Sequence, residues 1–171
     1  GHTMDFGRLI VAMATPFRKD LEIDLEKAAA LAARLIAEGV DSLVLSGTTG
    51  ESPTLSRKEK ADLITSVKKA VKVPIIGNAG TNDTRASIQY AKDAEEAGAD
   101  GLLLVAPYYN KPDQGMLYDH FAAIASSVRI PSMLYNVPGR TAISIRPETI
   151  VRLSRDVPNI SMLKDAAGVL D

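Results

Sequence analysis

The chain has 171 residues, with 20 Lys and Arg against 21 Asp and Glu, and a formal net charge of −1. This balance argues against a nucleic-acid partner, because binding to phosphates requires a basic surplus on one surface. Hydrophobic residues make up 46% and charged residues 24%, as in globular domains with a packed core. The longest apolar run, 102–106, is too short to cross a bilayer, and no Cys is present for disulfides or thiolate chemistry. We therefore expect a cytoplasmic protein with no membrane partner, in which residues 1–4 are a cloning remnant.

Short apolar runs, rich in branched residues, predict six β-strands. Each run is apolar throughout instead of alternating with polar residues, which is typical of a strand covered on both faces. The six predicted strands are 9–14, 42–46, 74–76, 101–105, 132–135 and 160–163.

Between these runs, apolar residues recur at spacings of three and four and predict five helices. Asp24 is expected to cap the first helix, which ends at Gly39. Ser56 and Glu59 have the spacing of a capping box and open a second helix that runs to Ala70. The other helices are expected over about 84–97, 116–127 and 147–154. This alternation indicates an α/β protein with a parallel sheet.

Two architectures fit the alternation, an open doubly wound sheet and a (β/α)₈ barrel. Length favours the open sheet, because a barrel typically requires about 250 residues. A weak internal repeat relates 38–45 to 96–104, at an offset equal to two strand–helix units. If the fold is a barrel, only its first six strands are present.

In both architectures the ligand site lies at the carboxyl ends of the strands, so the residues after each strand are the candidates. Thr48 and Thr49, bracketed by two glycines, follow the second strand and are suited to hold a small carboxylate. The alternative is a turn whose hydroxyls are solvated or cap the next helix. Lys164 follows the sixth strand, where desolvation would leave a neutral amine able to form an imine. The alternative is an ion pair with Asp165.

The fourth and fifth strands supply three further candidates. Tyr135 ends its strand and is suited to relay protons, or simply packs in the interior. Tyr109, beside Tyr108, is a loop anchor or part of an interface. Arg140 is suited to clamp a carboxylate, although such loop residues are often solvated or paired.

Other polar residues predict no chemistry. His120 is a lone histidine on a helix and is expected to be solvated, and 77–80 is interpreted as a structural loop after the third strand. The sequence shows no metal-ligand cluster and no phosphate-binding motif, so no metal is expected.

Four motifs in this order resemble the dihydrodipicolinate synthase family of the class I aldolase superfamily, which also contains N-acetylneuraminate lyase. The motifs are GTTGES at 47–52, PYYN at 107–110, YNVPGRT at 135–141 and KD at 164–165, and the resemblance extends from about Phe6 to the last residue. It implies a (β/α)₈ TIM barrel followed by helices, usually in a homotetramer.

The resemblance also implies an activity, the condensation of pyruvate with aspartate semialdehyde in lysine and diaminopimelate biosynthesis, without a cofactor. Lys164 matches the lysine that forms a Schiff base with pyruvate, and Tyr135 the tyrosine that relays protons. Thr48 links Tyr135 to Tyr109, which in the family reaches in from a neighbouring subunit. Thr48 and Thr49 also match the pair that holds the pyruvate carboxylate, and Arg140 the arginine that receives the aldehyde substrate.

The family's last two strand–helix units and its C-terminal helices have no counterpart in this sequence. We therefore expect residues 5–171 to be a partial catalytic barrel, either a fragment of a longer enzyme, which could be inactive, or a truncated variant. Two alternatives stay open: another pyruvate-dependent aldolase, such as one similar to N-acetylneuraminate lyase, and a non-catalytic assembly module.

Overall fold

The fold was analysed in a computed structural model, which describes residues 5–45, 55–79, 83–105, 113–135 and 145–162. Six strands within these ranges form one sheet, and all neighbouring strands are parallel. Their bounds lie within two residues of the predicted ones. They are β1 (Ile10–Met13), β2 (Ser42–Leu45), β3 (Ile75–Asn78), β4 (Gly101–Val105), β5 (Ser132–Tyr135) and β6 (Ile160–Met162).

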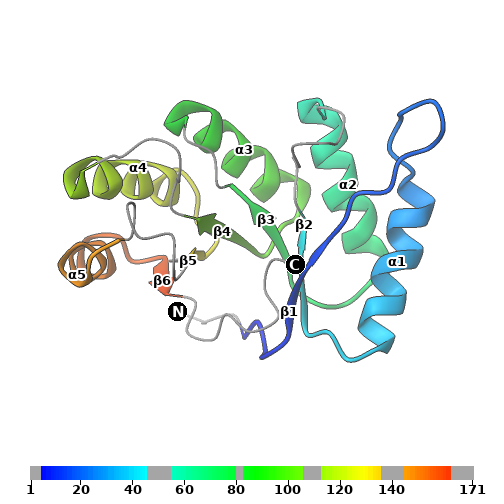
Figure 1. The fold of residues 1–171 in the computed structure, drawn as a ribbon, viewed down its shortest axis with the longest axis horizontal. Coiled ribbons are helices and arrows are strands. Elements are labelled where there is room, and N and C mark those ends of the chain that lie inside the picture. Colours follow the sequence, from blue (N-terminus) through cyan, green and yellow to red (C-terminus); the bar gives the residue numbers. More distant parts are fainter. Residues whose placement is uncertain (1–4, 46–54, 80–82, 106–112, 136–144, 163–171) are drawn as a thin grey trace.

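The strand order decides between the two predicted architectures. The strands lie side by side in chain order from β1 to β6. A doubly wound sheet has a point at which the strand order reverses, and this sheet has none. Figure 1 shows the helices following one another around one side of the curved sheet. This arrangement confirms the prediction of an α/β fold built as a partial (β/α)₈ barrel with six strands.

Five helices connect the strands, and the first four begin with a side-chain cap of their own. Asp24, Ser56, Asp83 and Asp113 each accept a hydrogen bond from a backbone N–H three residues later, and Ser56 and Glu59 form the predicted capping box. The helices are α1 (Leu25–Ala37), α2 (Arg57–Ala70), α3 (Thr84–Ala97), α4 (Gln114–Ser126) and α5 (Pro147–Asp156).

Successive strand residues point to opposite faces of the sheet, and each face has its own apolar cluster. The outer cluster joins strand residues such as Leu43 and Leu134 to helix residues such as Ile64 and Phe121. The inner cluster contains Ile10, Val44, Ile76, Leu103 and Met133, one residue from each of the first five strands. No helix residue belongs to this inner cluster, which is therefore the interior of the partial barrel.

The segment before β1 packs against the amino ends of the strands. Phe6 joins the inner cluster, and Ser42 at the start of β2 donates a hydrogen bond to its backbone carbonyl. A Cβ at Gly101 would lie 2.8 Å from Cζ of Phe6, so the ring fits only because residue 101 has no side chain. Phe6 therefore covers part of the inner cluster at the amino ends of the strands, opposite the edge where the candidate site is expected.

The predicted end of the third strand was wrong. Residues 77–80 were expected to form a structural loop, but Gly77 and Asn78 belong to β3 and pair with Leu102 and Leu103 of β4. Glycine is depleted in strands, which is why the sequence indicated a loop. The missing side chain gives room here to α3, because a Cβ would lie 3.2 Å from Oη of Tyr90, a tight contact.

Candidate active site

Parallel strands end at one edge of their sheet, so the segments that follow β2, β4, β5 and β6 all start from the same edge. These four segments carry the predicted site residues. Tyr135 is the only one within the described ranges. The other five, Thr48, Thr49, Tyr109, Arg140 and Lys164, lie outside the described residues, each two to five positions after the last residue of its strand.

Tyr135 is the last residue of β5 and lies on the inner face of the sheet. It is half-buried and packs against the inner apolar cluster, and its backbone is in register with Val105, the last residue of β4. The ring of Tyr135 therefore contacts apolar side chains, and the residue lies at the edge of the sheet from which the four candidate segments start. The prediction that Tyr135 ends its strand is confirmed, and its part in proton relay stays a prediction.

Strand register relates the end of β6 to the end of β5, which Tyr135 forms. Met162, the last residue of β6, is paired with Leu134, which precedes Tyr135 on β5. Lys164 comes two residues after Met162 in the chain. The predicted proton relay therefore ends β5, and the predicted imine-forming lysine follows, in the sequence, the end of the neighbouring strand β6.

The carboxyl end of β3 is fixed from the helix side by Tyr90. Its ring packs against the outer cluster, and its phenol bonds with the backbone of Asn78, the last residue of β3. Burial raises the pKa of this phenol, and the bond to Asn78 offsets only part of that effect. Tyr90 therefore links α3 to the last residue of β3.

His120 is not solvated, contrary to the prediction. Only 8% of its surface is exposed, and its Nδ1 lies 2.7 Å from Oγ1 of Thr84, in a side-chain hydrogen bond. Thr84 is the first residue of α3, and His120 lies on α4. A lone histidine among helix residues gave no sign of this contact, because the partner lies 36 positions away in the sequence. The residue therefore joins two helices.

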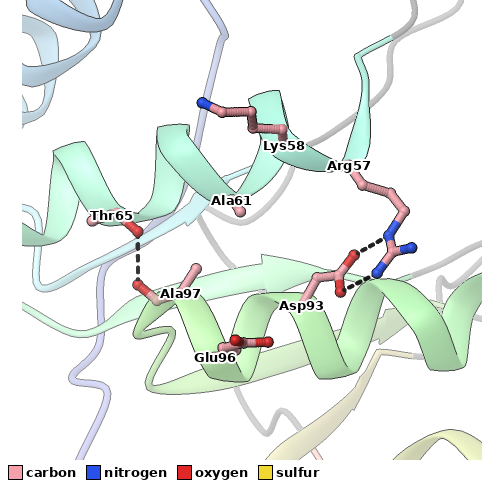
Figure 2. Close-up of a pocket in the computed structure, with 7 residues that line it drawn as sticks. All are labelled: Arg57, Lys58, Ala61, Thr65, Asp93, Glu96 and Ala97. Atoms are coloured by element: carbon pink, nitrogen blue, oxygen red, sulfur yellow. Dashed lines mark hydrogen bonds and ion pairs between the residues drawn. The ribbon is translucent and has the colours of Figure 1, made fainter.

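A pocket of about 360 Å³ lies between α2 and α3, on the outer side of the barrel (Figure 2). Arg57 at its rim makes two hydrogen bonds with Asp93, at 2.8 and 3.0 Å, and this pairing lowers the pKa of Asp93 and raises that of Arg57. Lys58, also at the rim, pairs with Asp62. Since these cations are paired within the protein, the pocket is a seam between helices and not the candidate active site.

Gln114, the first residue of α4, was not among the predicted site residues. Its side-chain oxygen accepts hydrogen bonds from the backbone of Arg146 and from the hydroxyl of Thr149, both at the start of α5. One signal was available: the predicted helix at 147–154 is preceded by Arg146, which has no side chain suited to cap it. The helix therefore required a cap from elsewhere.

Among the described residues, no group of three or more acidic, histidine or cysteine side chains could hold a metal ion. The helices in the described ranges are likewise too short or too polar to span a membrane.

The parallel sheet in chain order, with helices between its strands, defines a protein of the (β/α) barrel class. Comparison with known proteins is more specific. Residues 5–171 match the model of the dihydrodipicolinate synthetase family. The chain belongs to this family, as the four motifs predicted.

Three similar proteins illustrate the match. The 4-hydroxy-tetrahydrodipicolinate synthase of Desulforamulus reducens is 51% identical over 168 residues, which cover 97% of this chain and 57% of that protein. The crystal structure of a dihydrodipicolinate synthase from Bacillus anthracis has a TM-score of 0.83 and 43% identity, covering 99% of this chain and 62% of the other. The enzyme of Acinetobacter baumannii, solved in complex with pyruvate, has a TM-score of 0.81 and 44% identity, covering 96% and 57%. This chain thus spans about three fifths of the length of these relatives.

Proposed function

We propose that this chain is the larger part of the catalytic barrel of a lyase that condenses pyruvate with aspartate semialdehyde through a Schiff base. On this proposal residues 5–171 supply its first six strands and the five helices between them. The observation that carries the proposal is the family match over 5–171, together with a strand order that starts all four motif segments from one edge. The Acinetobacter relative with bound pyruvate supports the choice of this keto acid.

In the proposed reaction, the neutral amine of Lys164 attacks the ketone carbon of pyruvate and forms a C=N bond, and one water leaves. The iminium then loses a proton from the pyruvate methyl group and becomes an enamine. The enamine carbon forms a C–C bond with the aldehyde carbon of the semialdehyde, whose C=O π bond opens, and its oxygen takes up a proton to become a hydroxyl. The substrate's amino group then closes the ring by replacing Lys164 at the former ketone carbon, which frees the lysine. The imine serves as the electron sink, so the proposal includes no cofactor.

The other candidate residues bind substrates and move protons. We infer that Thr48 and Thr49 hold the pyruvate carboxylate and that Arg140 binds the carboxylate of the semialdehyde as a bidentate partner. Tyr135 passes protons to and from the reacting atoms, and Thr48 connects it with Tyr109. If Tyr109 comes from a second copy, as the family resemblance implies, the active form is a homo-oligomer. We place this enzyme in the cytoplasm.

Trapping with borohydride tests the imine. The chain is incubated with pyruvate and borohydride, which delivers a hydride to the imine carbon and leaves a stable secondary amine. We expect the intact mass to rise by one pyruvic acid less one oxygen atom, and we expect no rise in Lys164→Ala. Lys58→Ala, at an exposed lysine of α2, is the control and should be trapped like the unmodified chain. Folded protein without an adduct would support the non-catalytic alternative.

The aldehyde substrate is tested separately. After the imine has formed, consumption of pyruvate is followed with aspartate semialdehyde or with N-acetylmannosamine. The proposal predicts turnover with the first aldehyde only. Turnover with the sugar alone would favour the alternative aldolase similar to N-acetylneuraminate lyase.

A further inference from the structure

Helix α5 begins in a different way from the other helices of the described ranges. The four preceding helices each start with an Asp or Ser side chain that accepts a backbone N–H of the first turn. At α5 the N-cap position is occupied by Arg146, which makes no side-chain cap, and Pro147 follows at the first helical position. A helix start without a cap leaves backbone donors that require another partner.

Gln114 of α4 provides that partner. Its Oε1 accepts a hydrogen bond from the backbone N–H of Arg146 at 2.9 Å and another from the hydroxyl of Thr149 at 2.7 Å. A backbone N–H can only donate, so the oxygen of the Gln114 amide must face α5. Thr149 is 4% exposed, which places one of the two bonds in a region shielded from water.

Gln114 is itself well supported. It is the first residue of α4, whose start is capped by Asp113 through a 2.8 Å hydrogen bond from the backbone N–H of Met116. On the α5 side, the residue before Arg146 is Ile145, which is 2% exposed and belongs to the outer cluster. The bridge therefore joins two anchored backbone segments.

We infer that Gln114 is a positioning residue that fixes the start of α5 to the start of α4. In the sequence, α4 directly follows the segment that carries Tyr109, and α5 directly follows the segment that carries Arg140. Gln114 thus connects the start of α4, where the segment with Tyr109 ends, to the start of α5, where the segment with Arg140 ends. That Gln114 thereby affects binding of the aldehyde substrate rests on the proposed function.

The bridge is tested first by amide hydrogen exchange at Arg146, in the full chain. Gln114→Leu has a similar size but no acceptor, and Gln114→Glu keeps an acceptor for both donors. We expect exchange at Arg146 to be about tenfold faster in Gln114→Leu, the factor expected for one lost hydrogen bond, and unchanged or slower in Gln114→Glu. Gln89→Leu, at an exposed glutamine of α3, is the control and should leave Arg146 unaffected. Equal exchange at Arg146 in all variants would overturn the inference.

The second measurement separates positioning from a simple loss of stability. We expect Gln114→Leu to trap pyruvate as the unmodified chain does, while KM for aspartate semialdehyde rises about tenfold and Gln114→Glu restores it. A purely structural effect would reduce trapping and turnover together and would contradict positioning. If no variant traps pyruvate, the proposed function fails, and the exchange at Arg146 alone decides whether Gln114 fixes α5.

Discussion

Asp41 stabilises the backbone that leads into β1. Its carboxylate accepts hydrogen bonds from the backbone N–H groups of Arg8 and Leu9, both at 2.9 Å. These bonds favour the charged form and hold the pKa of Asp41 below its ordinary value of 3.8. A carboxyl whose pKa is lower in the folded than in the unfolded state stabilises the fold above the unfolded pKa. The contribution is lost as the pH falls through the folded pKa.

The lowered pKa of Asp41 predicts how the stability of Asp41→Asn depends on pH. At pH 7 the variant should unfold at a lower urea concentration than the unmodified chain, because the N–H groups of Arg8 and Leu9 both donate to one carboxylate oxygen, which the variant replaces with a neutral amide. As the pH falls below 3.8, the difference should shrink, since Asp41 becomes protonated in the unmodified chain. Urea unfolding between pH 7 and pH 3 measures both curves, with Asp119→Asn, an exposed position on α4, as the control for charge. A difference that grows towards acidic pH would contradict the role of Asp41.

At the scale of elements, the parallel strands are held to the helices by the outer apolar cluster. Leu134 in the middle of β5 is fully buried in this cluster, whereas Val151 on α5 is 62% exposed. Truncating a buried leucine removes apolar contacts and leaves a cavity that the surrounding structure fills only in part.

We therefore expect Leu134→Ala to lower the free energy of unfolding by about 2–5 kcal/mol. Val151→Ala on the exposed side of α5 should change it by less than about 0.5 kcal/mol. Denaturant unfolding of both variants gives the comparison. Similar small losses would mean that the sheet and helices are not packed as described, and similar large losses would mean that the exposed face of α5 is covered.

For the whole molecule, the sequence predicts the order and type of elements well, because continuous apolar runs and helix caps are local signals. All six strands and five helices of the described ranges were predicted, with ends shifted by only a few residues. The choice of a barrel over an open sheet depended on the family resemblance, since chain length favoured the other fold. The strand order then confirmed the barrel. The helices of the described ranges cover one face of the sheet, as they do when a sheet curves into a barrel.

The errors arose where a residue acts through a distant partner. His120 was expected in solvent because no residue near it in the sequence indicates its contact with Thr84. Gly77 was expected in a loop because no residue near it in the sequence indicates the close approach of Tyr90. Gln114 was missed for the same reason, since its two partners lie more than 30 positions away. The four motifs follow strands that end at one edge of the sheet, which is where the candidate site was predicted. Of the six predicted site residues, Tyr135 is the one within the described ranges.

A crystal structure of the chain soaked with pyruvate tests the central claim most directly, namely that the carboxyl edge of the sheet is an imine-forming site. We predict continuous electron density from Nζ of Lys164 to the central carbon of pyruvate, with the pyruvate carboxylate facing Thr48 and Thr49 and with Tyr135 beside the new bond. A free Lys164 side chain directed away from Tyr135, with pyruvate absent or bound elsewhere, would contradict the account.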